Sequence, residues 1–159
     1  MIPLGNRKRG QTIAELLATV LLVGVVAALG APRLAGASVD TRSSKMEDTL
    51  AEVRSAIGAY RARADREGLA PFPMLEQLSA PGAVAGLVLP ANSLTGVRGV
   101  QPVTRDQARR RAVLNEGRFG WNYFVDNLAN PPEAVFYANC RGRTTAPAPG
   151  PGTLSANEL

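Results

Sequence analysis

The chain has 159 residues, which is room for one domain with a modest hydrophobic core. Aromatic residues make up only 5% of it, Gly and Pro number 16 and 12, and His is absent, so we expect a small, loop-rich protein without the commonest general base. Three of the five net positive charges are Arg7, Lys8 and Arg9, and the remaining surplus is too small to predict nucleic-acid binding. These features favour neither an enzyme nor a nucleic-acid-binding protein.

A long apolar stretch follows the basic N-terminal segment. Residues 11–31 contain a single formal charge, on Glu15. About 20 apolar residues are enough to cross the hydrocarbon core of a bilayer as a helix. We therefore predict a leader at residues 1–10 and a transmembrane helix at 11–34, with the basic end on the cytoplasmic side. A carboxylate inside a membrane costs roughly 2.5–3.5 kcal/mol, so Glu15 is a functional candidate that needs a cationic partner.

The junction of the two segments resembles a known processing site. Gly10 followed by Gln-Thr-Ile-Ala-Glu-Leu-Leu is similar to the cleavage site of type IV pilins and type II secretion pseudopilins. The resemblance covers about residues 7–34 and implies that a prepilin peptidase cuts after Gly10 and methylates the new N-terminus, Gln11. The family's acid lies at the fifth residue of the mature chain, which is Glu15 here. Phe or Met is usual at the first mature position, and this chain has Gln.

The resemblance also implies the function. A pilin or pseudopilin waits in lipid of the bacterial inner membrane and is then built by an inner-membrane assembly platform into a periplasmic or cell-surface filament of like subunits. Glu15 would pair with the cationic N-terminus of a neighbouring subunit, and Pro32 matches the family proline where the helix bends or unwinds. We expect no catalytic residue, metal or cofactor.

Two alternatives to a filament subunit stay open. The chain is also compatible with a single-pass, membrane-anchored binding protein that does not polymerise. Ala35-Gly36-Ala37 resembles a signal-peptidase site, which would release a secreted soluble domain beginning at Ser38. The length of the apolar run and the presence of Glu15 count against this second alternative.

Beyond Pro32 the sequence predicts an amphipathic continuation of the helix at residues 35–68. Pro32 removes a helical hydrogen bond, so a kink or local melting is expected at 28–32. Gly68 is a suitable stop. The predicted core-facing residues recur at spacings of three and four: Met46, Leu50, Val53, Ile57, Tyr60 and Ala64.

Residues 69–140 are predicted to form a small β-sheet head. A short helix is expected at 74–78, weak strands at 83–89 and 96–103, and an antiparallel pair at 119–125 and 134–140. The aromatics of the last two segments are interpreted as core, packed against the helix. The motif Leu89-Pro90-Ala91-Asn92 with Leu94-Thr95-Gly96 resembles a turn of some pseudopilin heads.

Three further features of the head are candidates for sites. The basic segment 105–111 is interpreted as a solvated loop or short helix, because no aromatic is interleaved to stack a base. The single Cys140 cannot form an intrachain disulfide and is interpreted as a buried thiol. Some relatives bind calcium in this region, but the spacing of the local candidates matches no calcium loop. These candidates are Asp126, Asn127, Asn130 and Glu133.

Residues 141–159 are rich in Pro and Gly and are predicted to be disordered. The expected fold is therefore α+β: a long N-terminal α-helix, membrane-spanning in its first half, packed against a small antiparallel β-sheet head and followed by a disordered C-terminal tail.

Overall fold

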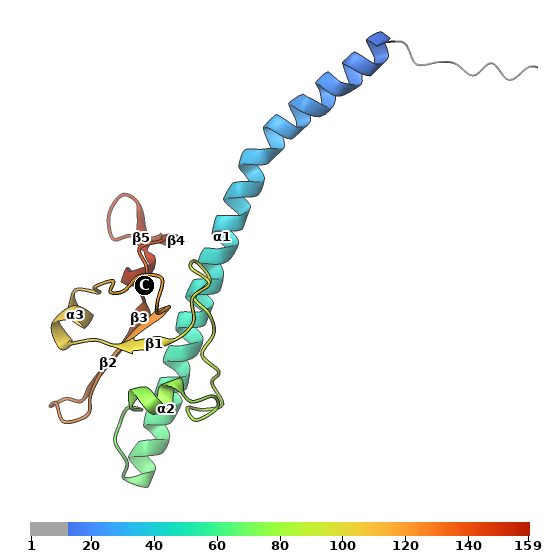
Figure 1. The fold of residues 1–159 in the computed structure, drawn as a ribbon. Coiled ribbons are helices and arrows are strands. Elements are labelled where there is room, and N and C mark those ends of the chain that lie inside the picture. Colours follow the sequence, from blue (N-terminus) through green and yellow to red (C-terminus); the bar gives the residue numbers. More distant parts are fainter. Residues whose placement is uncertain (1–12) are drawn as a thin grey trace, which may run out of the picture. The chain divides into compact units, whose positions relative to one another are not determined.

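The structure, a computed structural model, describes the backbone of residues 13–159 and the side chains of residues 38–159. The chain divides into two compact units, Met1–Ser38 and Val39–Leu159, and the second is called the head here. Figure 1 shows the elements. They are α1 (Ile13–Glu67), α2 (Leu75–Ser79), β1 (Val100–Pro102), α3 (Arg105–Arg109), β2 (Trp121–Asp126), β3 (Glu133–Ala138), β4 (Arg143–Pro147), β5 (Thr153–Ser155) and the 3₁₀-helix η1 (Ala156–Glu158).

Within the head, α1 buries the predicted apolar stripe. All six predicted residues, from Met46 to Ala64, are at most 8% exposed, so the interpretation of this segment as a core-facing helix is confirmed. The helix ends at Glu67, directly before the predicted stop Gly68, whose φ is +66°. The N–H of Leu69 donates to the carbonyl of Ala64 at 3.0 Å, which satisfies a carbonyl of the last turn.

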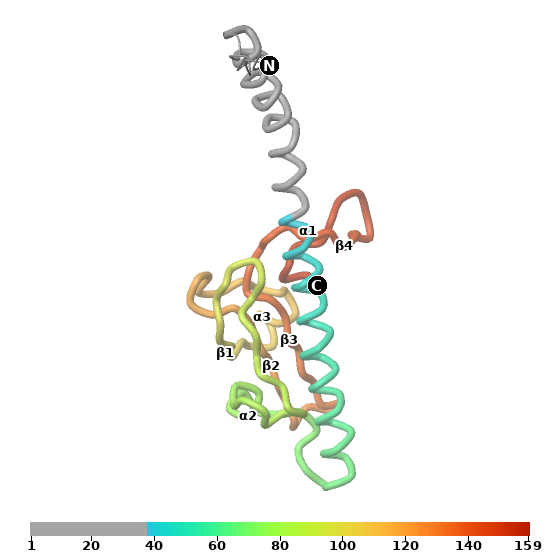
Figure 2. The backbone as a smooth tube through the Cα atoms, turned by 90° about the vertical axis from the view of Figure 1, so that its right-hand side faces the viewer, coloured from blue at the N-terminus to red at the C-terminus, as the bar shows by residue number. Residues whose placement is uncertain are grey.

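The three-stranded sheet has the order β1-β2-β3, and α1 covers one of its faces (Figures 1 and 2). The predicted antiparallel pair is confirmed: β2 and β3 run antiparallel, with Trp121 opposite Ala138. The sheet is not wholly antiparallel, because β1 runs parallel to β2. Helix α3 lies in the crossover between these two strands, as a parallel connection requires, and packs on the face away from α1.

One predicted strand is wrong. Residues 83–89 form tight turns, closed by a 2.8 Å hydrogen bond from the N–H of Gly82 to the carbonyl of Leu87. Ala85 and Gly86 have φ of +49° and +78°, which no strand accommodates. Val84 and Leu87 are still buried, so the apolar residues that suggested a strand serve the core from a turn.

The predicted disorder of residues 141–159 is also wrong. The segment forms the hairpin β4-β5 and η1, and it belongs to the head. Thr144 Oγ1 donates to the carbonyl of Leu154 at 2.6 Å, and the N–H of Thr145 donates to Ser43 Oγ on α1 at 2.8 Å. Ala156 is fully buried. The prediction from composition failed because a few hydrogen bonds and one small buried residue are enough to order this Pro/Gly-rich segment against α1.

The backbone of α1 is helical without a break from Ile13 to Glu67, so the local melting expected at 28–32 is absent. Over the described part of the chain, no helical stretch combines the length and the hydropathy that a membrane span requires. The side chains of the expected membrane helix, 11–34, lie outside that part.

Candidate functional site

The four residues predicted to act in processing and assembly fall at or beyond the limit of the described chain. Gly10 and Gln11 lie outside the described residues. Glu15 and Pro32 lie within α1 by their backbone, but their side chains also lie outside. The pairing expected of Glu15 therefore stays a prediction.

The loop at residues 90–97 ties α1 to the sheet. Asn92 is fully buried, and its Nδ2 donates to the carbonyl of Gly120 at 2.9 Å. Ser93 Oγ donates to the carbonyl of Arg42 on α1 at 2.8 Å. The same Asn92 amide lies 3.5 Å from the sulfur of Cys140, which is 2% exposed, so the prediction of a buried thiol is confirmed.

The aromatic residues of β2 and β3 form core, as predicted, but on both faces of the sheet. Trp121, Tyr123 and Phe136 pack on the α1 side, whereas Phe124 and Tyr137 pack with Ala108 of α3 on the other side. Trp121 and Phe136 stack with ring centroids 5.2 Å apart, and Trp121 Nε1 donates to the carbonyl of Pro90 at 2.8 Å. Tyr123 Oη donates to the carbonyl of Pro73 at 2.8 Å. Burial, with a smaller contribution from nearby Tyr60, raises the pKa of Tyr123, because the phenolate would lose its hydration.

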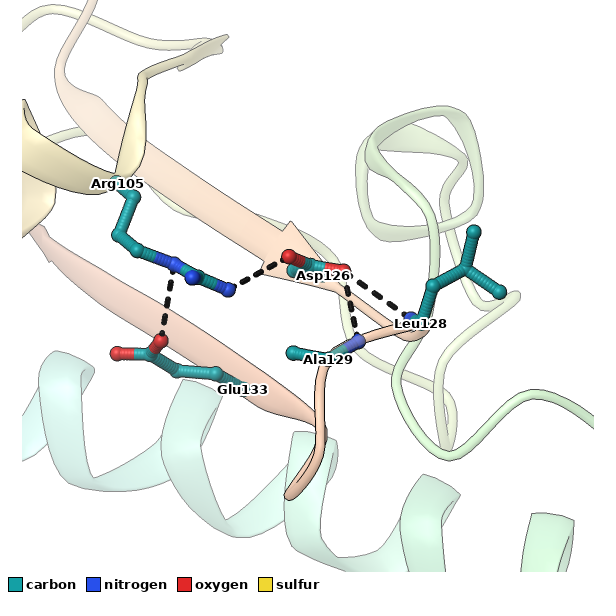
Figure 3. Close-up of polar contacts among 5 residues, drawn as sticks. All are labelled: Arg105, Asp126, Leu128, Ala129 and Glu133. Carbon is teal, nitrogen blue, oxygen red and sulfur yellow. Dashed lines mark hydrogen bonds and ion pairs between the residues drawn. The ribbon is translucent and has the colours of Figure 1, made fainter.

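A hollow of about 620 Å³ lies beside the β2–β3 turn and contains one charged cluster (Figure 3). Arg105 Nη2 lies 2.6 Å from Asp126 Oδ2, and its Nε lies 3.5 Å from Glu133 Oε2. Asp126 Oδ1 also accepts hydrogen bonds from the N–H groups of Leu128 and Ala129, at 3.1 and 3.0 Å. The guanidinium therefore bridges the last residue of β2 and the first residue of β3.

This cluster includes two of the residues considered for calcium. Arg105 forms ion pairs with the carboxylates of both Asp126 and Glu133. The cation that faces these two carboxylates is therefore a side chain of the same protein. Among the described side chains, no group of three or more Asp, Glu or Cys residues is placed to hold a metal ion. All three charged residues are more than a third exposed, so we expect the ion pairs to contribute less than about 1 kcal/mol.

The basic segment 105–111 does not form a single cationic patch. Its first part is the short helix α3, whose Thr104 cap accepts a hydrogen bond from the N–H of Gln107. Arg105 lies in the hollow beside the β2–β3 turn, whereas Arg111 lies over the ring of Tyr137 at 5.2 Å. Arg109 and Arg110 are the exposed arginines of this segment, whereas Arg105 and Arg111 are partly buried. The arginines of this segment therefore make separate contacts.

A second hollow, of about 450 Å³, was not predicted from the sequence. It lies between α1 and β3 and is called the arginine groove here, because Arg54, Arg61 and Arg111 line it. Arg54 and Arg61 are seven residues apart on α1, next to the buried stripe. A spacing of seven places both on one face of a helix, and this was the feature of the sequence from which part of the groove could have been predicted. The third arginine comes from the segment after α3, and only the fold brings it to α1.

Comparisons with protein-family models, with curated proteins and with solved structures found no match to this chain. The function proposed for it therefore depends on the resemblance of residues 7–34 to prepilin processing sites and on the geometry of the head.

Proposed function

We propose that the chain is a structural subunit, a pilin or pseudopilin, of a type IV pilus or type II secretion pseudopilus. Prepilin peptidase cuts it after Gly10 and methylates Gln11, and the N-terminal helix then assembles with like subunits. The observation that carries the proposal is the sequence from Arg7 to Leu17, in which a basic segment, a glycine and an acid at the fifth following residue precede an apolar helix. Catalysis has no part in this function.

The boundary between the two units falls within α1, and this supports the same proposal. The head begins at Val39, and the burial of described α1 side chains begins at Ser43. Residues 11–31, which hold one charge, precede this region. An apolar helix outside the head needs lipid or other helices to cover it. In the proposed life of the subunit, residues 11–34 span the inner membrane first and then pack in the filament core.

Glu15 and Pro32 have distinct roles in this proposal. A carboxylate in an apolar helix bundle is tolerated when it is paired, and the partner proposed for Glu15 is the N-terminal amine of the neighbouring subunit. Such a pair fixes the register between subunits. Pro32 removes one helical hydrogen bond and so lets the helix bend or unwind as subunits pack.

Processing is the direct test. We expect the wild-type chain, coexpressed with a prepilin peptidase, to begin at Gln11 and to carry one added methyl group by intact mass. Gly10→Val should leave the leader attached, because a branched side chain does not fit where the peptidase requires glycine. Gly36→Val is the matched control, and it should be processed as the wild type is. A mature chain beginning at Met1 or at Ser38 in the wild type contradicts the proposal.

A membrane-anchored binding protein is the second candidate, and the arginine groove is the observation that favours it. That function predicts an unprocessed N-terminus and no self-association in a pull-down between two differently tagged copies. Cleavage after Gly10 together with self-association excludes it.

A further inference from the structure

The arginine groove brings three arginine side chains to one hollow. None of Arg54, Arg61 and Arg111 forms an ion pair with an acidic side chain among residues 38–159. The groove is lined by no acidic side chain. The hollow beside the β2–β3 turn differs in this respect, because its Arg105 is neutralised by two carboxylates. Of the hollows described between residues 38 and 159, the groove between α1 and β3 is the one lined by arginines and by no acidic side chain.

The contacts that these arginines do make leave donors unused. Arg54 Nη2 donates to the main-chain carbonyl of Phe136 at 3.3 Å and to a main-chain oxygen of Leu159, the last residue of the sequence, at 2.7 Å. Arg61 and Arg111 lie over the rings of Phe72 and Tyr137, at 5.0 and 5.2 Å. Arg111 Nη1 is buried and has no hydrogen-bond partner. A buried guanidinium nitrogen without an acceptor costs free energy, and an incoming oxygen would recover it.

The pKa of Arg54 also indicates that an anion in the groove would be stabilising. Burial, followed by repulsion from Arg111, lowers the pKa of Arg54. The two cations therefore destabilise each other, and an anion between them would stabilise both. Guanidinium groups bind carboxylates through paired N–H donors, which is the strongest class of charge-assisted hydrogen bond in proteins.

The walls of the groove indicate what carries the anion. Apolar side chains from α1, from the loop before α2, from β3 and from the end of the chain line the groove together with the arginines, so a fitting occupant has apolar groups beside its charge. These side chains are Ile57, Phe72, Ala134, Val135, Phe136 and Leu159. Strand β3 is an edge strand, and the Phe136 carbonyl faces the groove, since Arg54 on α1 reaches it. Leu159 already places a main-chain oxygen on Arg54 and an apolar side chain against the core.

We propose that the arginine groove binds an acidic segment of another polypeptide, whose carboxylate contacts Arg61 and Arg111 and whose apolar side chain lies against Phe72. A peptide fits better than a small inorganic anion, because the groove combines apolar walls and a strand edge with its charges. The site lies wholly within the head and does not depend on filament assembly.

The test uses the full-length chain in a nonionic detergent and a fluorescent octapeptide of alternating Glu and Leu with blocked ends. We expect fluorescence anisotropy to show saturable binding that weakens as salt is raised, because charge pairing contributes to it. A peptide with Gln in place of Glu should bind at least about tenfold more weakly, the loss expected when charge-assisted hydrogen bonds are removed.

Two variants separate the groove from bulk charge. Arg61→Gln, in which the lost group has no polar contact described within the head, should weaken binding of the Glu peptide about tenfold. Arg118→Gln is the matched control, because Arg118 is exposed and also lies over an aromatic ring, that of Phe119 at 5.4 Å. It should change the affinity less than twofold.

Three outcomes would overturn the proposal. The first is equal binding of the Glu and Gln peptides, or no binding of either. The second is an equal loss of affinity in both variants, which would indicate attraction by net charge alone. The third is displacement of the peptide by inorganic phosphate at the same concentration as by unlabelled peptide, which would indicate a small-anion site. Circular dichroism of each variant confirms that the head is folded.

Discussion

Amide side chains hold the inner loops of the head in place. Gln101, Asn122 and Asn139 lie side by side on the sheet, with Gln101 Nε2 donating to Asn122 Oδ1 at 2.8 Å and Asn122 Nδ2 donating to Asn139 Oδ1 at 3.0 Å. Asn139 Nδ2 donates in turn to the carbonyls of Leu114 and Phe119. All three amides are buried, and each offers both a donor and an acceptor. They anchor the loop before β2 from the sheet side, so these polar residues have a structural function.

Tyr123 provides a pH-dependent prediction at the scale of one residue. Its pKa is raised in the folded head, so between pH 10 and the folded pKa the unfolded chain loses a proton that the folded chain keeps. The contribution of Tyr123 to stability is therefore complete below pH 10 and is lost as the pH rises. We expect the free energy of unfolding to fall by up to about 1.4 kcal/mol per pH unit above pH 10 from this residue.

The variant Tyr123→Phe isolates that effect. At pH 7 it should cost about 1 kcal/mol, because the hydrogen bond to the Pro73 carbonyl is lost. Between pH 10 and 11 its urea unfolding curves should shift less with pH than those of the wild type. Equal slopes for the two proteins would show that Tyr123 does not carry the alkaline loss of stability.

At the scale of elements, patterns that repeat along the chain were predictable and long-range pairing was not. The stripe on α1 and the β2–β3 pair follow from periodicity and were predicted with nearly their observed bounds. The parallel pairing of β1 with β2 depends on a crossover that no local pattern encodes. The ordered structure of the β4–β5 hairpin depends on a hydrogen bond between Thr145 and Ser43, which are 102 residues apart in the sequence. The arginine groove was missed for the same reason, since Arg111 reaches α1 only through the fold.

Gly120, directly before β2, and Gly58, in α1, differ in whether the structure has room for an added Cβ atom. A Cβ at Gly120 would lie 2.2 Å from the carbonyl oxygen of Val97 and 3.1 Å from Cβ of Asn92. Gly120→Ala should therefore destabilise the head by roughly 1–3 kcal/mol or more, because backbone must move. Gly58→Ala is the matched control: it lies in α1 with nothing within 4 Å of the added atom, and it should stabilise the protein by about 0.5–1 kcal/mol.

Thermal or urea unfolding of the two variants measures this difference. A loss of stability in Gly58→Ala would mean that α1 is not helical there or is covered in solution. Unchanged stability in Gly120→Ala would mean that the loop at residues 90–97 is not seated against β2 as described.

At the scale of the whole molecule, we expect the two units of the chain to have separate functions. The head is held together by its own core, in which the α1 stripe meets Trp121, Tyr123 and Phe136. Every buried member of the described core lies between Met46 and Ala156. Changes before Ser38 should therefore alter assembly without altering the stability of the head, and changes in the head core should do the reverse.

Glu15→Ala tests this separation. In cells that carry the assembly machinery, we expect the variant to insert in the membrane and to keep the unfolding midpoint of the wild-type head, while the yield of sheared filaments falls about tenfold or more. The reason is that removing one partner of a buried ion pair leaves the N-terminal amine of the neighbouring subunit uncompensated, at a cost of about 3–5 kcal/mol. Glu52→Ala is the control, since it removes an exposed carboxylate from the same helix within the head and should leave filament yield unchanged. A normal yield of filaments from Glu15→Ala would contradict the pairing, and a lowered unfolding midpoint would contradict the independence of the head.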